Sequence, residues 1–463
     1  MTDQPLVMVL NGPNLNLLGS REPHIYGHDT LDDIAERLEA QAAALGLALD
    51  VRQSNHEGHI VDWLHEAGAR GALAVLLNAG ALTHTSVAIH DAIKGIAVPV
   101  IEVHLTNIHQ RPAPYTHSTV SLAARGVTAL AMDAVQQANS GHPGAPMGMA
   151  DIAEVLWNDF LRHNPANPRW ANRDRFVLSN GHASMLLYSL LHLSGYDLPM
   201  KQLKKFRQFG AKTAGHPEVD LDIGVETTTG PLGQGITNAV GMALAEKILA
   251  EHFNRPGFPI VDHHTYVFVG DGCLMEGVSH EAASLAGHQK LGRWIVVFDD
   301  NQITIDGSTN LTCSDDVAMR FTSYGWEVVR LGAIGEDLDA LESALVAARD
   351  SQDDRPKLLV LQTQVGFPSP DWTGKHEAHG NPFTAEHVTK TKTAMGIPDQ
   401  PFWAPQEVVD ACRVQAKKNG SAENTAWKSR LNSSAQKTEW DAAWNGGAAG
   451  WQELLPTFAQ GES

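Results

Sequence analysis

Cysteine is scarce in this sequence of 463 residues, which holds only Cys273, Cys313 and Cys412. Three thiols are too few for a disulfide framework or a zinc cluster. No apolar run approaches the ~20 residues that a membrane-spanning helix needs. The start, Met1 to Asn11, also lacks the basic segment of a secretory signal. The sequence therefore predicts a protein of the reducing cytoplasm with no membrane partner.

Positively charged residues are also few. The sequence has 34 Lys and Arg against 53 Asp and Glu, which gives a formal net charge of −19. Such a field repels nucleic acid and acidic membranes. We therefore expect no nucleic-acid partner, and we expect anionic substrates to be held by local donors and metal ions. The 23 histidines are many for this length, but their number alone decides nothing.

The first hundred residues alternate between short apolar segments and helical patterns. Strands are predicted at residues 6–10, 51–54, 73–77 and 98–105. This alternation is typical of βαβ units and of a parallel sheet covered on both faces. Ligands on such sheets bind beyond the carboxyl ends of the strands. Asn14, Asn78 and His104 stand at such ends.

A second, larger α/β region begins near Thr128. Apolar strands are predicted at residues 265–269, 294–298 and 357–362, with long helical patterns between them. After about Asn381 the sequence is helix-prone but polar and carries scattered tryptophans. The predicted organisation is therefore one α/β domain over residues 1–127, a larger doubly wound α/β domain over 128–380, and a helical C-terminal or linker segment over 381–463.

Five sequence blocks in the first domain carry chemically useful side chains. They are Asn11–Gly19, Ser20–Gly27, Gln53–Gly58, Asn78–Ser86 and Glu102–Asn107. Each block alone is weak, but in this order they closely resemble type II 3-dehydroquinate dehydratases over about residues 5–127. The resemblance implies a flavodoxin-like sheet and the dehydration of 3-dehydroquinate to 3-dehydroshikimate.

Dehydration of a β-hydroxy ketone needs a base for the α-proton, a donor for the enolate and an acid for the leaving hydroxyl. A tyrosine is a poor base at neutral pH unless a cation favours its phenolate. The resemblance makes Tyr26 the base and Arg21 its activator. It makes His104 the general acid, oriented by Glu102, and it assigns enolate stabilisation to Asn14.

The same resemblance implies a set of substrate contacts, which are Asn78, His84, Leu105, Thr106 and Arg111, with Asp91 near the site of a neighbouring subunit. The sequence departs from the family after Arg111, where the residues at 112–115 are Pro-Ala-Pro-Tyr. Ser118 to Val127 predicts the start of a further strand, and the family's C-terminal helix is not recognisable after it. We expect apolar sheet surface to be exposed there unless the first helix of the next domain takes the place of that helix.

The second domain carries an ordered series of His- and Gly-containing motifs. They are Ser140–Gly144, Ser179–His182, Gly215–Glu218, Gly230–Gly235, Gly270–Gly272, Asp299–Asn301 and His376–Gly380. Together they closely resemble the N-terminal, thiamine-diphosphate-binding domain of transketolases, and the resemblance extends over about residues 128–460. Gly270-Asp271-Gly272 on its own would indicate only a tight turn. The spaced Asn301 and the four motif histidines favour a cofactor site.

A diphosphate needs a hard cation and backbone amides, and Mg²⁺ prefers oxygen ligands. Asp271, Asn301 and the carbonyl of Ile303 are therefore predicted to hold Mg²⁺. A loop that enters a helix offers amides to an anion, which assigns Gly230, Pro231 and Leu232, together with Gly272, to the cofactor. By resemblance, His182, His216 and His379 contact thiamine diphosphate, and His142 and His379 contact the sugar substrate.

Two interpretations of the whole chain stay open at this point. One is a fusion of two enzyme modules whose transketolase part requires a separate pyrimidine-binding subunit for two-carbon ketol transfer between sugar phosphates. The other is a non-catalytic assembly or cofactor-binding module, since no linker separates the two resemblances and each lacks its far end. A homo-oligomer is expected from both families.

Overall fold

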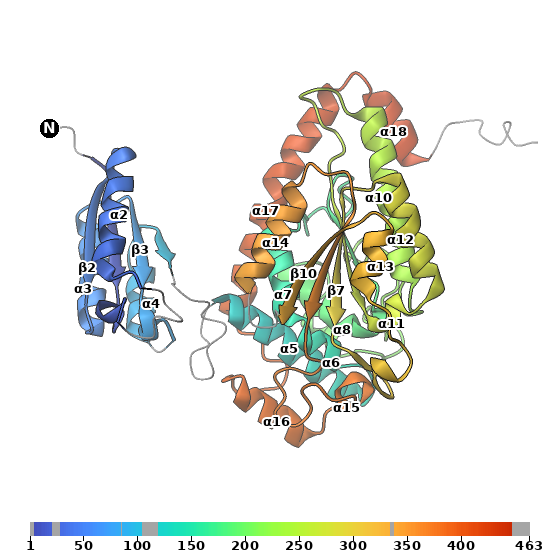
Figure 1. Ribbon diagram of the computed structural model, residues 1–463, viewed down its shortest axis with the longest axis horizontal. Coiled ribbons are helices and arrows are strands. Elements are labelled where there is room, and N and C mark those ends of the chain that lie inside the picture. Colours follow the sequence, from blue (N-terminus) through green and yellow to red (C-terminus); the bar gives the residue numbers. More distant parts are fainter. Residues whose placement is uncertain (1–3, 21–27, 85, 104–118, 334–337, 447–463) are drawn as a thin grey trace, which may run out of the picture. The chain divides into compact units, whose positions relative to one another are not determined.

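The computed structural model describes residues 4–20, 28–84, 86–103, 119–333 and 338–446 (Figure 1). The chain divides into two compact units. The first contains residues 1–125 with 336–340 and 391–399, and the second contains 126–335, 341–390 and 400–463. None of the described helices is long and apolar enough to cross a membrane.

The first unit contains a four-stranded sheet in the order β2-β1-β3-β4. Its strands are β1 (Leu6–Asn11), β2 (Ala48–Gln53), β3 (Ala74–Asn78) and β4 (Val100–Glu102), and every pairing is parallel. The helices are α2 (Leu31–Ala44), α3 (Glu57–Ala69) and α4 (Val87–Lys94), with short turns η1 (Leu15–Leu17) and η2 (Gly80–His84). This is the strand order of flavodoxin-like folds, as predicted.

Local sequence signals explain these elements. Thr30 and Asp33 form a reciprocal capping box at the start of α2, which satisfies backbone N–H groups that the first helical turn leaves free. The core consists of apolar side chains from β1, β3, α3 and α4, among them Met8, Leu10, Leu64 and Val75. The carboxyl ends of β1, β2 and β3 thereby come to one edge of the sheet.

The second unit contains a five-stranded sheet in the order β10-β11-β7-β6-β5. The strands are β5 (Arg175–Leu178), β6 (Thr265–Gly270), β7 (Trp294–Asp300), β10 (Glu327–Ala333) and β11 (Lys357–Gln362), all parallel. A hairpin of β8 (Ile303–Thr304) and β9 (Gly307–Ser308) follows β7. Every residue of β5 and β6 is buried, as expected for a sheet covered on both faces.

Helices cover both faces of this sheet. Figure 1 shows α10 (Gln234–Phe253), α12 (Gly277–Gln289) and α13 (Val317–Ser323) along one side, and α7 (Ala150–Val155), α14 (Leu338–Asp350) and α17 (Gln406–Ser433) along the other. The remaining α-helices are α6 (Gly144–Gly148), α8 (Ser184–Ser194), α9 (Met200–Leu203), α11 (Asp271–Leu274), α15 (Glu377–Gly380), α16 (Ala385–Ala394) and α18 (Lys437–Asn445). The chain also forms the π-helical η4 (Leu156–Phe160) and the 3-10 turns η5 (Gly181–Ala183) and η6 (Thr309–Leu311). The doubly wound fold predicted for this domain is confirmed.

The strand predicted at Ser118 to Val127 is wrong, because α5 is a continuous helix over Thr119–Ala138. The segment is rich in alanine, the strongest helix former. All residues from 123 to 135 are buried, including the charged Arg125 and Asp133, so this part of the helix lacks the exposed polar face of an ordinary surface helix. The helix also crosses the boundary predicted between residues 127 and 128.

Within the segment predicted as a helical linker, α17 and α18 pack into the second unit. Trp427, Leu431 and Trp440 are buried in one cluster with Phe253 and Ile260, and the indole N–H of Trp427 donates to the Ile260 carbonyl at 2.7 Å. The α17 helix also lies close to the loop before β5. Asn424 Oδ1 accepts hydrogen bonds from Asn164 and Asn167 there, at 3.1 and 2.9 Å.

Gly420→Ala is expected to destabilise the second unit by about 2 kcal/mol, because a Cβ at this position would lie 1.7 Å from the carbonyl oxygen of His163. Chemical denaturation monitored by tryptophan fluorescence measures the effect. Gly241→Ala in α10 is the matched control, since a Cβ there meets nothing within 4 Å and helix propensity favours alanine by up to about 1 kcal/mol. Equal stability of the two variants would contradict the packing of α17.

Candidate active sites

Asp271 and Asn301 lie at the carboxyl ends of two neighbouring strands. Asp271 directly follows β6, and Asn301 directly follows β7. The Asp271 carboxylate accepts a hydrogen bond from the backbone N–H of Gln302 at 3.1 Å, which ties the two strand ends together. Asn301 Nδ2 donates to Asp299 at 2.9 Å, and Asn301 Oδ1 accepts from the N–H of Ile303 at 3.0 Å. The three predicted metal ligands are therefore brought together.

Several carboxylates lie close together at this strand edge, where a cation would be favoured. Burial, with the neighbouring carboxylates Asp299 and Asp300, raises the pKa of Asp271 to about 8. Burial likewise raises the pKa of Asp299 to about 6. A positive ion beside Asp271 would offset both effects and keep the carboxylate charged at neutral pH.

The donor set suits a hard ion that is shared with a phosphate ligand. No group of three His, Cys, Asp or Glu residues suited to a metal occurs among the described residues. The site instead offers one carboxylate, one amide oxygen and one backbone carbonyl. Mg²⁺ needs about six oxygens and usually takes several from phosphate and water, so the residues present fit Mg²⁺ bound together with a diphosphate.

Glycines allow close packing of the backbone in and around the loop that leads into α10. Gly230 has φ +142°, and a Cβ there would lie 3.1 Å from the His216 ring. A Cβ on Gly181 would lie 2.6 Å from the Gly230 nitrogen, and one on Gly272 would lie 2.8 Å from Leu232. Because α10 begins at Gln234, this loop presents the N-terminus of a 20-residue helix, where an anion is favoured.

Four histidines that are far apart in the sequence form one cluster. The ring centroids of His142 and His182 are 5.2 Å apart, those of His142 and His379 are 5.7 Å apart, and those of His182 and His379 are 5.0 Å apart. His216 lies 6.3 Å from His142. The structure thus places near one another the four histidines that the sequence analysis assigned to one site.

The histidine rings are held neutral by their surroundings. Burial, followed by the influence of His379 and Arg207, lowers the pKa of His142 to about 4. Burial also lowers the pKa values of His182, His216 and His379. Neutral imidazoles can both donate and accept hydrogen bonds, which suits a polyol substrate.

Several buried polar atoms around the cluster have no partner within the described protein. They are His142 Nδ1, Asn180 Oδ1 and Thr229 Oγ1. Buried polar atoms are nearly always paired in proteins. Their position beside Gly181 and Gly230 indicates that a polar ligand completes the site.

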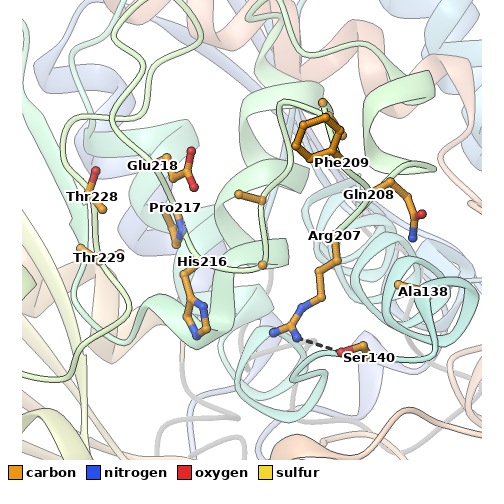
Figure 2. A pocket seen from close by; sticks show the side chains of 14 residues that line it. Ala138, Ser140, Arg207, Gln208, Phe209, His216, Pro217, Glu218, Thr228 and Thr229 are labelled. Carbon is orange, nitrogen blue, oxygen red and sulfur yellow. Dashed lines mark hydrogen bonds between the residues drawn. The ribbon is translucent and has the colours of Figure 1, made fainter.

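An open groove of about 920 Å³ lies beside the histidines. Figure 2 shows Arg207 and His216 directed into the same space, with Glu218, Thr228 and Thr229 on the His216 side of the groove. Arg207 donates to Ser140 Oγ at 2.8 Å. The sequence motifs did not single out Arg207, because an isolated arginine 67 positions from its partner carries no pattern. Ser140 belongs to the motif Ser140–Gly144, but the sequence did not predict a role for its side chain.

The first unit brings part of the predicted dehydratase site together. Asn14 follows β1 in a left-handed conformation with φ 66°, which costs a non-glycine residue roughly 1 kcal/mol. Asn78 ends β3 and accepts a hydrogen bond from the Gly80 N–H at 3.3 Å. The exposed Glu102 ends β4, and Asp91 is exposed on α4. His84 ends η2, and its side chain is not described. Tyr26, Arg21, His104, Leu105, Thr106 and Arg111 lie outside the described residues.

The parallel sheet, the strand-end acid and amide, and the glycine loop at a helix N-terminus define the class of thiamine-diphosphate-dependent α/β domains. A family model for the thiamine diphosphate binding domain of transketolase matches residues 119–445. The chain belongs to the transketolase family. The model of class II dehydroquinases matches residues 5–135, so the chain joins a dehydroquinase II domain to a transketolase N-terminal domain. Thiamine diphosphate with Mg²⁺, predicted from the sequence, is the cofactor pair of the transketolase domain.

Curated relatives and solved structures support this assignment. Transketolase 1 of Escherichia coli strain K12 is 58% identical over 308 residues, which is 66% of this chain and 46% of that protein. The chromosomal transketolase of Cupriavidus necator is 56% identical over 319 residues, 69% of this chain and 47% of that protein. The crystal structure of a Pichia stipitis transketolase complex with sedoheptulose 7-phosphate has 44% identity and a TM-score of 0.70, covering 75% of this chain and 52% of that one. The chain spans about half the length of these relatives.

His142→Gln is expected to make the protein less sensitive to acid. A histidine with an ordinary pKa of 6.5 and a folded pKa of about 4 takes up its proton more readily when unfolded. Its contribution to the free energy of unfolding is therefore complete above pH 6.5 and falls as the pH is lowered toward about 4. Urea unfolding at about pH 7.5 and about pH 4.5 should show a smaller loss in the variant than in the wild type. The value at the higher pH provides the baseline, and equal losses would refute a neutral, buried His142.

Proposed function

We propose that residues 128–380, completed by the helical segment 381–463, are the cofactor-binding half of an enzyme that transfers two-carbon ketol units between sugar phosphates. The observation that carries this proposal is the placement of Asp271 and Asn301 at neighbouring strand ends, in the same unit as a cluster of four neutral histidines. Fold and family membership alone would not fix the reaction, since function resides in the site.

The chain's own residues then divide into two groups. Asp271, Asn301 and the Ile303 carbonyl would hold Mg²⁺ and through it a diphosphate, while backbone groups of Gly230 to Leu232 and of Gly272 approach the same ligand. His182 and His216 would contact the cofactor. His142 and His379 would hydrogen-bond the hydroxyls of the sugar. When bound, thiamine diphosphate supplies the nucleophilic carbon for the ketol transfer.

Completion of the transfer requires a pyrimidine-binding partner. The curated relatives are about twice as long as the part of them that this chain matches. We infer that a further domain or separate subunit binds the aminopyrimidine end of the cofactor. We also infer that the complex contains more than one copy of this chain. Free thiols at Cys273, Cys313 and Cys412 suit the reducing cytoplasm in which we place it.

We propose that residues 1–127 dehydrate 3-dehydroquinate. In this scheme Tyr26, activated by Arg21, removes the proton next to the ketone, and Asn14 stabilises the resulting enolate. His104, oriented by Glu102, gives a proton to the leaving hydroxyl, which departs as water. Asn78, His84, Leu105, Thr106 and Arg111 would hold the substrate, with Asp91 near a neighbouring subunit.

A second candidate function is that of an assembly module that binds cofactor without turnover. It is favoured by the overlap of the two family matches on α5, residues 119–135, because both modules then draw on one helix. The two candidates differ in whether the purified chain converts 3-dehydroquinate.

Asp271→Ala is expected to weaken thiamine diphosphate binding in the presence of Mg²⁺ at least about tenfold, because the charged ligand of the ion is lost. Isothermal titration calorimetry of the full chain measures this. Asp306→Ala is the matched control, since Asp306 is an exposed acid in the nearby β8–β9 turn. Unchanged affinity in Asp271→Ala would exclude this metal site.

Tyr26→Phe is expected to lower the rate of 3-dehydroquinate conversion by about 10²- to 10⁴-fold, as loss of a catalytic base does. Thiamine diphosphate binding should stay at the wild-type level in this variant, and Asp271→Ala should keep the dehydratase rate. A wild-type rate in Tyr26→Phe would show that another residue is the base. An inactive wild-type chain that still binds cofactor would favour the assembly module.

A further inference from the structure

The backbone N–H of Asn14 is fastened to the segment that follows β2 by the side chain of Asn55. Asn55 Oδ1 accepts a hydrogen bond from the backbone N–H of Asn14 at 2.9 Å. The same oxygen accepts a second hydrogen bond from Gln53 Nε2 at 3.0 Å. Since a carbonyl oxygen has two acceptor sites, both sites of Asn55 Oδ1 are used within this loop. Two N–H donors also fix which end of the Asn55 amide faces Asn14.

Other contacts hold the rest of the loop, and the Asn14 carbonyl accepts from the Leu17 N–H at 3.1 Å, while the Asn14 N–H donates to Asn55. Gln53 Nε2 also donates to the Gly12 carbonyl at 3.2 Å, and the Gly12 N–H donates to the Asn78 carbonyl at 2.7 Å. A Cβ on Gly12 would lie 2.3 Å from the Ala79 carbonyl oxygen. The loop therefore passes tightly between the ends of β2 and β3 before it reaches Asn14.

The anchored residue is the one with an unfavourable backbone. Asn14 has φ 66° and ψ 0°, and no side-chain hydrogen bond caps η1 from this position. Left-handed conformations of non-glycine residues persist where surrounding contacts over-determine them, and such residues are often functional. The hydrogen bond from Asn55 supplies such a contact at the backbone itself.

We propose that Asn55 is a positioning residue for dehydration, which fixes the backbone from which the Asn14 amide reaches the enolate. The inference rests on the proposed dehydratase function of the first domain. Asn55 acts through Asn14 and makes no contact with the reacting atoms. Gln53 supports the same oxygen from the other side. The block Gln53–Gly58 thereby has a physical role that its motif alone did not reveal.

The test compares Asn55→Ala with Asn55→Asp in the full chain. Asp keeps an oxygen in the same place and needs only to accept, so it preserves both hydrogen bonds, whereas Ala removes them. Asn16→Ala is the control on the same loop, because its side chain accepts a long hydrogen bond of 3.5 Å from Gln53 Nε2 and none from Asn14. The first readout is hydrogen exchange of the Asn14 amide, measured by mass spectrometry with residue-level fragmentation. It requires no enzymatic activity.

Exchange at Asn14 should accelerate at least about tenfold in Asn55→Ala and remain near the wild-type rate in Asn55→Asp and Asn16→Ala. The second readout is steady-state conversion of 3-dehydroquinate. There kcat of Asn55→Ala should fall about ten- to hundredfold with KM nearly unchanged, because a displaced catalytic group loses rate rather than binding. Asn55→Asp should lie between it and the wild type, since its carboxylate adds a charge beside a developing enolate.

Wild-type exchange in Asn55→Ala would overturn the proposal, and so would equal exchange in the Ala and Asp variants. A rise in KM at constant kcat would also overturn it, since Asn55 would then contact the substrate directly. If the wild-type chain does not convert 3-dehydroquinate, the proposed dehydratase function fails, while the exchange comparison still decides whether Asn55 anchors Asn14.

Discussion

Burial of a parallel sheet on both faces is the constraint from which the cofactor site follows. The strands β5, β6 and β7 are almost wholly inaccessible to solvent, so their faces carry packing and no chemistry. Polar groups can appear only where the strands end. Parallel order puts all carboxyl ends at one edge, and the segments after β6 and β7 therefore bring Asp271 and Asn301 together. Burial at this position raises the pKa of Asp271, and a cation bound beside the carboxylate would lower that pKa again.

The same close packing decides the state of the histidines. Ring centroids of His142, His182 and His379 lie 5.0 to 5.7 Å apart, and His216 lies 6.3 Å from His142. Several positive charges this close together and largely buried would repel one another strongly. Burial lowers their pKa values, so the cluster is neutral and offers donors and acceptors in place of charge. In the proposed site the negative charge of the diphosphate is therefore balanced by the cation, by backbone amides and by the N-terminus of α10.

The sequence predicted the parallel sheets and the turns that follow their strands, because the motifs lie at turns where residue type is dictated by chemistry. Asp271 and the glycine loop could be assigned roles before any coordinates. What the sequence did not predict has a physical reason in each case. Arg207 reaches Ser140 only through the tertiary fold. Asn55 acts through a backbone hydrogen bond, which leaves no mark on side-chain patterns. The pairing of α17 with the loop near Asn164 joins residues 260 positions apart.

The N-terminal half of the helix α5 was predicted as a strand for a different reason, and its burial bears on the part of the chain where the two family matches overlap. The alternation of apolar and polar residues in a strand and their helical period in a helix both depend on one face being exposed to solvent. Residues 123–135 have no exposed face. The two family matches overlap within this helix. Because a helix forms and melts cooperatively, its N-terminal turns cannot unfold without weakening the turns that follow. Because the two family matches overlap on this one helix, a change that unfolds its first turns is therefore expected to weaken the turns that belong to the second unit.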